Sequence, residues 1–252
     1  MNPFTSLAGP IEREEEMDAA ELSPARYAKV LADLSRVNAL TLARRPTLGF
    51  LDRVRARSGR AGGGAAGGGG AGGSDAKPWR ILDVGFGAGD MLARIARWGD
   101  ARGVALDLVG VDLNPKSAPV AAARLGGRAR LITGDYRDLA GQGWDIILSS
   151  LVTHHMSAGQ RRTFLRFMDA ESARGWLVND LHRQRLPFAG FPLLARLAFA
   201  DPIVRRDGQL SVGRSFRRAE WQTMLADALP ETAAECRIFR SFPWRLCVER
   251  IR

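Results

Sequence analysis

A short apolar run that ends in alternating glycines constrains the fold more than any other feature of this chain. Residues 80–84 are mostly apolar, and residues 83–90 read Asp-Val-Gly-Phe-Gly-Ala-Gly-Asp. Met91, Leu92 and Ile95 follow at helical spacing. Glycines at alternate positions let the backbone turn tightly and present its N–H groups to a ligand at the start of a helix. The segment predicts a strand, a ligand-binding turn and a helix in that order.

Further apolar runs alternate with helical stretches after this loop. The five strands that we expect are residues 80–84, 105–111, 129–133, 144–149 and 176–179. Strands that alternate with helices form a parallel sheet, and ligands bind such sheets beyond the carboxyl ends of the strands. We therefore expect the functional residues at those ends. Two later runs, residues 235–240 and 245–251, are expected to close the sheet as an antiparallel pair.

The part of the chain before the loop is expected to be helical. Ser23 and Pro24 mark a helix start, because serine caps helices and proline favours their first turn. A second helix is expected over residues 47–57. Residues 61–74 contain nine glycines among fourteen residues and read as a flexible linker. The predicted organisation is a helical lid or extension at 1–60, a linker at 61–78 and a main domain at 79–252, with an apolar insertion at about 184–214.

The composition narrows the classes of protein to which the chain can belong. The net charge is +10, but the 34 arginines and three lysines are spread along the whole sequence, which disfavours a nucleic-acid-binding patch. No uncharged apolar run approaches the roughly 20 residues of a membrane-spanning helix, and the start lacks the pattern of a secretion signal, so a cytoplasmic location is expected. Cys236 and Cys247 are the only cysteines, so we expect neither a disulfide framework nor a metal site.

Acidic residues follow the second and third expected strands. Asp112 lies 23 residues after Gly89, and Asp135 with Tyr136 follows the third strand. A carboxylate at the first position can accept hydrogen bonds from two ribose hydroxyls. A carboxylate at the second can accept one from an adenine amine, with the tyrosine beside the ring. The pattern predicts a ligand that contains a nucleoside.

Together these motifs resemble those of the class I S-adenosylmethionine-dependent methyltransferases over residues 79–178. The matching segments are Leu-Asp-Val-Gly-Phe-Gly-Ala-Gly at 82–89, Val-Asp-Leu-Asn at 111–114, Gly-Asp-Tyr at 134–136, and residues 144–155. A nicotinamide-binding turn would more often carry a third glycine at position 90, which is aspartate here. The resemblance implies an α/β, Rossmann-like, doubly wound and mostly parallel seven-stranded sheet, with a C-terminal antiparallel strand pair and an N-terminal helical extension.

The resemblance also implies S-adenosylmethionine as cofactor, with S-adenosylhomocysteine as its product. The residues that it assigns to the cofactor are Asp83, Gly85, Gly87, Gly89, Asp112, Leu113, Asp135, Tyr136 and Ser149. The glycines would line the methionine part, Asp112 would hold the ribose, and Asp135 with Tyr136 would flank the adenine. Asp83 would organise the loop, and the carbonyl of Ser149 would face the amino group of the cofactor.

Methyl transfer requires a nucleophile that is held close to the methyl group and aligned with it. A hydroxyl acceptor also needs a base. The chain has three histidines, His154, His155 and His182, which follow the fourth and fifth expected strands. The pKa of histidine suits proton transfer near neutral pH. These histidines, with Asp180 as a residue that could orient one of them, are the candidate catalytic residues, although each could equally cap a helix or pack beneath the cofactor.

The acceptor is expected to be a small hydrophobic molecule. Residues 149–152 read Ser-Ser-Leu-Val, which departs from the Asn/Asp-Pro-Pro-aromatic motif of enzymes that methylate the amino groups of nucleic-acid bases. Neither cysteine is near this region, as pyrimidine C5 methylation would require. The apolar residues 186–200 are expected to form a substrate cover or else a core helix, and a cover of this kind would also suit contact with a membrane surface.

The predicted function is O-methylation of a phenolic, quinone or polyketide-like acceptor. Three alternatives stay open at this point: C- or N-methylation of a small molecule, methylation of RNA, and cofactor binding without catalysis. No pattern in the sequence sets the oligomeric state.

Overall fold

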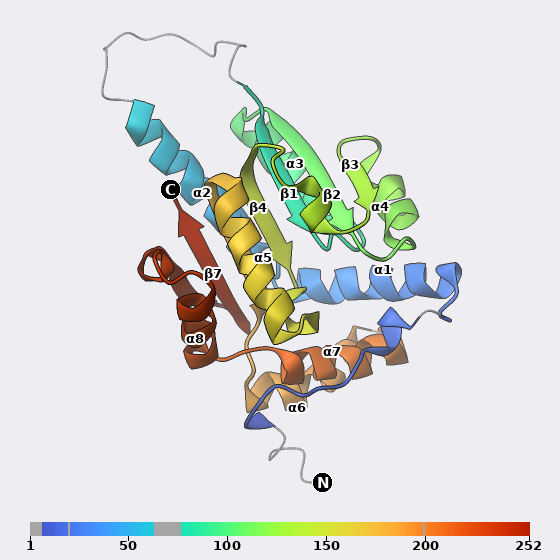
Figure 1. The fold of residues 1–252 in the computed structure, drawn as a ribbon. Coiled ribbons are helices and arrows are strands. Elements are labelled where there is room, and N and C mark those ends of the chain that lie inside the picture. Colours follow the sequence, from blue (N-terminus) through green and yellow to red (C-terminus); the bar gives the residue numbers. More distant parts are fainter. Residues whose placement is uncertain (1–6, 20, 63–76, 199) are drawn as a thin grey trace.

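The computed structural model describes residues 7–19, 21–62, 77–198 and 200–252. Its centre is a seven-stranded sheet with the strand order β3-β2-β1-β4-β5-β7-β6 (Figure 1). The strands are β1 Trp79–Val84, β2 Leu106–Asp112, β3 Arg130–Thr133, β4 Trp144–Ser150, β5 Ser172–Leu181, β6 Arg237–Ser241 and β7 Arg245–Ile251. Strands β1 to β5 are parallel to one another, and β7 is antiparallel to both β5 and β6. The predicted fold class is confirmed.

The fifth strand is longer than the sequence predicted. Residues 176–179 form only its apolar middle, because β7 pairs with it from Gly175 to Leu181. Gly175 permits this pairing at close range, since a Cβ atom there would lie 2.3 Å from the carbonyl oxygen of Arg250. The residues before the apolar run are mostly polar or glycine, so the apolar pattern did not indicate that they belong to the strand.

Helices cover both faces of the sheet, as a doubly wound fold requires. The helices are α1 Pro24–Leu40, α2 Arg45–Gly62, α3 Asp90–Arg102, α4 Ser117–Leu125, α5 Ala158–Glu171, α6 Arg185–Leu197, α7 Pro202–Arg214 and α8 Arg218–Ala228, with the short turns η2 Glu16–Asp18, η3 Tyr136–Leu139, η4 Thr153–His155 and η5 Ala233–Glu235. One face packs against α2, α3 and α4, and the other against α5 and α8. None of the helices in these described ranges has the length and apolar composition of a membrane span.

The structure divides the N-terminal helical segment into two parts with different positions. Helix α2 buries Phe50, Leu51 and Val54 against the sheet, so it belongs to the core of the main domain. Helix α1 instead lies across the carboxyl ends of the strands (Figure 1). Of these two helices, only α1 lies over the ends of the strands, where a cover would be expected. Most of the expected linker, residues 63–76, lies outside the described residues.

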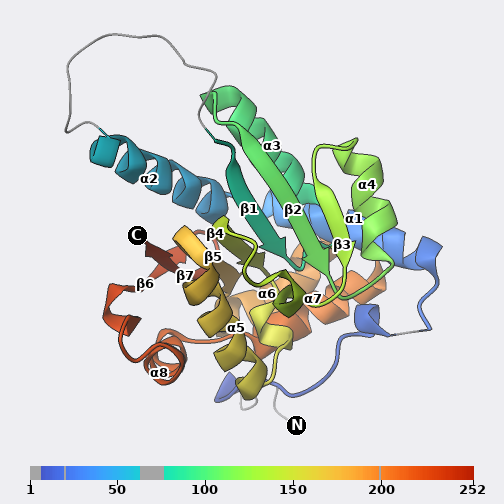
Figure 2. The same ribbon diagram turned by 45° about the horizontal axis from the view of Figure 1, so that its top comes forward.

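A helical layer closes the carboxyl edge of the sheet (Figure 2). Helices α6 and α7 pack against each other, and α7 also packs against α1 and the N-terminal turn η2. Backbone N–H groups of Glu16 and Met17 donate hydrogen bonds to the carboxylate of Asp207 at 3.0 and 2.8 Å, which fixes the N-terminal segment along α7. This layer positions residues that are distant in sequence over the ends of the strands.

Candidate active site

A cavity of about 1020 Å³ lies between the carboxyl ends of the strands and the covering layer. One half is lined by the glycine loop, by residues 111–116 after β2 and by residues 134–137 after β3. The other half is lined by α1, by the segment after β4 and by α6 and α7. Seven of the nine sequence-predicted cofactor residues line this cavity, the exceptions being Gly89 and Ser149.

The glycine loop needs glycine for two different reasons. At Gly85, φ is +77° and a Cβ atom would lie 2.3 Å from Cγ2 of Val152, so a side chain would collide with the segment after β4. At Gly89, φ is +68° and a Cβ atom would lie 2.8 Å from Cβ of Ala121. Gly89 therefore permits close packing between α3 and α4, and it shapes the loop without lining the cavity.

Asp112 braces this loop from the end of β2. Its Oδ2 accepts a hydrogen bond from the backbone N–H of Gly87 at 2.8 Å, and its Oδ1 accepts one from Asn114 at 2.9 Å. A carboxylate can accept about four hydrogen bonds, so these two backbone bonds are compatible with further bonds to ribose hydroxyls. The adjacent side chain of Leu113 is 76% exposed and lines the cavity.

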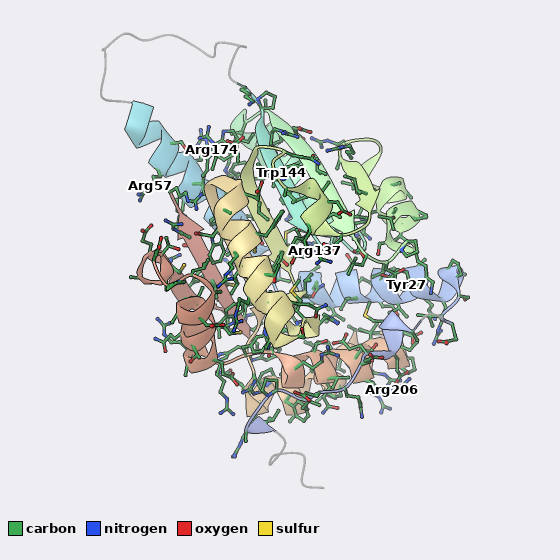
Figure 3. All side chains as sticks on the ribbon, viewed as in Figure 1. Tyr27, Arg57, Arg137, Trp144, Arg174 and Arg206 are labelled. Carbon is green, nitrogen blue, oxygen red and sulfur yellow. The ribbon has the colours of Figure 1, made fainter. Side chains whose placement is uncertain are left out.

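The residues after β3 provide a polar edge and an aromatic wall. Asp135 accepts hydrogen bonds from the backbone N–H of Arg137 at 2.9 Å and from its guanidinium at 2.7 Å. These bonds with Arg137 lower the pKa of Asp135, so the carboxylate is charged at neutral pH. The ring of Tyr136 packs edge-on against Phe164 and Phe167, with centroid distances of 4.9 Å. Arg137 and Tyr27, which also line the cavity, are labelled in Figure 3.

Three carboxyl groups surround the start of the loop. Burial of Asp83, with repulsion from Asp90 and Asp112, raises the pKa of Asp83 to about 8. Arg44, at the junction of α1 and α2, contacts Asp90 at 2.8 Å. This ion pair ties the N-terminal helices to the glycine loop, and it could not be predicted from local sequence.

Ser149 does not line the cavity, although the sequence assigned its carbonyl to the cofactor. The residue is 1% exposed, and its hydroxyl has no hydrogen-bond partner among the residues that the structure describes. The next residue, Ser150, lines the cavity instead. The strand continues to Ser150, one residue beyond the predicted end, which accounts for the shift.

His154 is fixed between two carboxylates beneath the cavity. Its Nδ1 lies 2.7 Å from Oδ1 of Asp180, and its Nε2 lies 3.7 Å from Oε1 of Glu15. Burial disfavours the imidazolium, but the carboxylates of Asp180 and Glu15 outweigh that cost and raise the pKa of His154 to about 9. Burial likewise opposes the charge on Asp180, yet His154 and neighbouring hydrogen bonds lower the pKa of Asp180 to about 2. The pair is charged at neutral pH.

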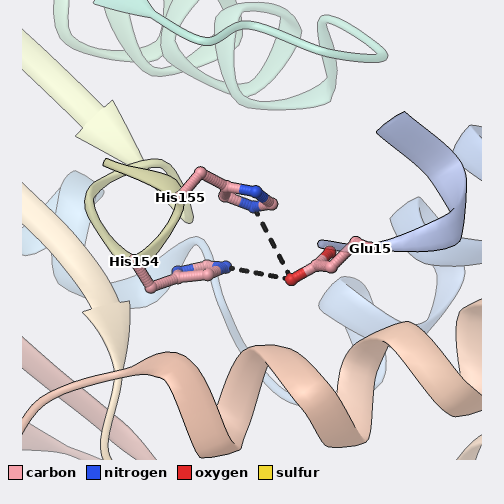
Figure 4. A group of neighbouring side chains, drawn as sticks. All are labelled: Glu15, His154 and His155. Carbon is pink, nitrogen blue, oxygen red and sulfur yellow. Dashed lines mark ion pairs between the residues drawn. The ribbon is translucent and has the colours of Figure 1, made fainter. Parts of the chain in front are cut away.

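His155 is the histidine that reaches the open part of the cavity. Its side chain is 29% exposed, its Nε2 lies 3.8 Å from Oε1 of Glu15, and its ring stacks on that of His154 with centroids 4.3 Å apart. Figure 4 shows both imidazoles pointing toward the same carboxylate. Glu15 comes from the N-terminal segment, and sequence reading missed it because one glutamate in an acidic run usually belongs to a solvated surface.

His182 lies away from the cavity, so its prediction as a catalytic residue needs correction. It does not line the cavity, and its backbone N–H donates to the carbonyl of Trp244 at 3.0 Å. Burial and repulsion from three arginines, Arg240, Arg217 and Arg183, lower the pKa of His182 to about 4. The end of β5 turns its side chain into this arginine-rich layer, an orientation that spacing alone could not reveal.

The acceptor half of the cavity is mainly apolar. Its apolar side chains are Met17, Leu31, Leu34, Met156, Leu181, Pro187, Phe191, Val204, Val212 and Trp244. Pro187 and Phe191 belong to α6, so the apolar run after β5 forms one wall of the cavity. Residues from α1, α6 and α7 converge there, although they are distant in sequence.

A parallel sheet with a glycine loop after β1, and carboxylates after β2 and β3, defines the class I methyltransferase fold. Residues 81–170 match the family model described as a methyltransferase domain. The chain therefore carries a methyltransferase domain, and the prediction of an S-adenosylmethionine-dependent methyltransferase is confirmed at this level.

Solved structures with the same fold share little sequence with this chain. The plantazolicin methyltransferase BpumL, in complex with a monoazolic desmethylPZN analog and S-adenosylhomocysteine, has 15% identity and a TM-score of 0.59 over 88% of this chain and 90% of that chain. A second BpumL complex, with a triazolic analog, has 15% identity and a TM-score of 0.53 over 88% and 85% of the two chains. Magnesium protoporphyrin IX methyltransferase from Synechocystis PCC 6803 has 16% identity and a TM-score of 0.46 over 69% and 74%. No curated protein sequence matches this chain.

Proposed function

We propose that this methyltransferase methylates a hydroxyl group of a small hydrophobic acceptor. The observation that carries the proposal is the continuity of the cavity, which joins the glycine loop and Asp112 at one end to apolar walls and two histidines at the other. Its volume of about 1020 Å³ reaches the top of the roughly 300 to 1,000 Å³ range of small-molecule sites. That volume suits a cofactor and an acceptor side by side.

The residues of the first half fit S-adenosylmethionine. We assign Asp112 to the ribose hydroxyls, Asp135 and Tyr136 to the adenine, and the backbone around Gly85 and Gly87 to the methionine part. When bound, this cofactor supplies an electrophilic methyl group on a positively charged sulfur. The negative charge of the Asp112 carboxylate attracts this positive charge.

The residues of the second half orient the acceptor and remove its proton. His154 is unsuited to be the base, because its pKa of about 9 keeps it protonated at neutral pH. His155 is the imidazole that faces the cavity, and as the general base it takes the proton of the acceptor beside the carboxylate of Glu15, which lies 3.8 Å away. Asp180 and His154 act as positioning residues, since they hold Glu15 and the ring of His155 in place. Apolar walls from α1 and α6 exclude water from this step.

The alternatives differ in what they require of the cavity. An RNA substrate would have to reach the glycine loop past the layer of α1, α6 and α7, whose inner side chains are mostly apolar. Carbon or nitrogen methylation of a small molecule would use the same cavity with less need for His155. Cofactor binding without catalysis would leave no role for a histidine beside an apolar pocket. We include a cytoplasmic location in the proposal, because Cys236 and Cys247 are both free thiols.

The test is the turnover of His155→Gln with a panel of simple phenols and hydroxyquinones, measured as formation of S-adenosylhomocysteine. Loss of the base should lower the rate by about 10² to 10⁴-fold while cofactor affinity stays unchanged. His182→Gln is the matched control and should retain its rate, because this side chain lies outside the cavity. Equal rates for the two variants at every pH tested would contradict the assignment of His155 as the base.

A further inference from the structure

Three side chains at the acceptor end place potential metal ligands together. Glu15, His154 and His155 each offer one ligand atom, and these three atoms all lie within 4.8 Å of one another (Figure 4). The glutamate oxygen is 3.7 Å from the first nitrogen and 3.8 Å from the second. Two imidazoles and one carboxylate are a donor set that suits divalent transition metals such as zinc, cobalt, manganese or iron.

The nitrogen of His154 that faces this cluster is buried and unsatisfied. Its side chain is 1% exposed, and Nε2 has no hydrogen-bond partner within the described residues. The opposite nitrogen, Nδ1, contacts Asp180 at 2.7 Å. A carboxylate that holds one ring nitrogen of histidine fixes its tautomer and directs the other nitrogen toward a metal, which is the usual arrangement behind metal-binding histidines.

Glu15 is held in a comparable way. Its side chain is 2% exposed, and Oε1 accepts a hydrogen bond of 2.7 Å from the hydroxyl of Ser211 on α7. Burial of a carboxylate is costly unless it is paired or coordinates a metal. The segment around Glu15 is itself fixed by the backbone hydrogen bonds of Glu16 and Met17 to Asp207. Oε1 of Glu15 is therefore held in place by a segment that is itself hydrogen-bonded to α7.

We propose that Glu15, His154 and His155 bind one divalent transition-metal ion that faces the acceptor, and that this ion takes the place of the proton on Nε2 of His154. This inference rests on the proposed function, because it names the means by which the acceptor hydroxyl is ionised. Ligands of a tetrahedral ion with bonds of about 2.1 Å lie roughly 3.4 Å apart, so the three atoms need to approach one another by a few tenths of an ångström to at most about 1.4 Å. The partly exposed ring of His155 has room to make that movement.

Three protein ligands leave a coordination position for a hydroxyl oxygen of the acceptor. An ion at this place would lower the pKa of the hydroxyl, so that the acceptor gives its proton to bulk water as it binds, before the apolar walls enclose it. The oxygen forms a bond to the methyl carbon while the carbon–sulfur bond breaks, and the bonding pair stays on sulfur, which becomes a neutral thioether. His155 is then a ligand, and no separate base is required. The acceptor class implied is a phenol or another hydroxyl compound of low pKa.

The test is titration of untagged, chelator-treated protein with Co²⁺, followed by visible absorption and calorimetry. We expect one ion per chain, bound through nitrogen and oxygen donors. Glu15→Gln and His155→Gln should each weaken Co²⁺ binding by about tenfold or more. Glu14→Gln and His182→Gln, which alter the same residue types outside the cluster, should bind like the unmodified chain. Circular dichroism establishes that each variant is folded.

Absence of Co²⁺ absorption, or unchanged affinity in folded Glu15→Gln, overturns the metal site. Full turnover by chelator-treated protein also overturns it, and then the proposed function stands with His155 as base. Conversely, Co²⁺ binding that depends on these residues in a protein that methylates no hydroxyl compound supports the metal site and rejects the proposed function. The metal site and the proposed function are therefore rejected by different measurements, Co²⁺ binding for the first and methylation of hydroxyl compounds for the second.

Discussion

Replacing the buried carboxylate of Asp180 with an amide should destabilise the chain in a pH-dependent way. In the metal-free protein, Oδ1 of Asp180 accepts hydrogen bonds from His154 and from the backbone N–H of Leu181, both at 2.7 Å. The pKa of Asp180 is lowered from 3.8 to about 2, which corresponds to about 2 kcal/mol of stability. The pKa of His154 is raised from 6.5 to about 9, but that value also contains the effect of Glu15. We therefore expect Asp180→Asn to cost about 2 to 3 kcal/mol where both groups are charged.

The direction in which this loss of stability changes with pH follows from the two pKa shifts. The contribution of Asp180 is present above pH 3.8 and is lost as the pH falls through about 2. The contribution of protonated His154 is complete below pH 6.5 and is lost as the pH rises through about 9. Urea unfolding of the metal-free protein at pH 5.5 should show a larger loss for Asp180→Asn than at pH 9.5, by about 2 kcal/mol. Asp227→Asn, at an exposed ion pair, is the control and should change stability little. An equal loss at both pH values would refute the charge pairing.

Three further predictions concern the loop and the covering layer. Asp83→Asn should gain stability relative to the unmodified chain by about 2 kcal/mol or more as the pH rises from about 4 to about 8, because burial raises the pKa of Asp83 from 3.8 to about 8 and only the unfolded chain ionises this group over that range; parallel pH profiles of unfolding would contradict this. Gly85→Ala should lose more stability and cofactor affinity than Gly103→Ala, since both have positive φ but only Gly85 also faces a collision. Leu193→Gln combined with Leu197→Gln should reduce sedimentation with anionic lipid vesicles, because these leucines are 62% and 69% exposed on a helix that also carries exposed arginines; equal sedimentation would argue against membrane contact.

The features that sequence reading found are those encoded locally. Gly85, Asp112 and Asp135 each follow directly after a short apolar run in the sequence. Because parallel strands end at the same edge of a sheet, this spacing is enough to place the three residues around one edge. Helix α1 was predicted because Ser23 caps it and Pro24 occupies its first position, and the structure has this cap. Each of these features depends on neighbours in the chain rather than on packing.

The features that it missed depend on contacts between distant residues. Glu15 reaches His154 across 139 positions because the N-terminal segment is held along α7, which no local pattern indicates. Helix α2 joins the core through Phe50 and Leu51, so reading the segment as a separate lid gave too much weight to the glycine-rich stretch after it. His182 follows a strand end as His154 does, but it does not line the cavity, and Arg240, Arg217 and Arg183 are near enough to lower its pKa.

The central claim is that the cavity binds the methyl donor through the carboxylate after β2. Calorimetry with S-adenosylhomocysteine on the unmodified chain and on Asp112→Ala tests it most directly. Loss of charge-assisted hydrogen bonds to the ribose, and of the brace on Gly87, should weaken binding by about 2 to 4 kcal/mol, or about 30- to 1,000-fold in Kd. Asp107→Ala, on the same strand with an exposed carboxylate, should bind like the unmodified chain. Equal affinity for Asp112→Ala, or no binding by the unmodified chain, would contradict the account.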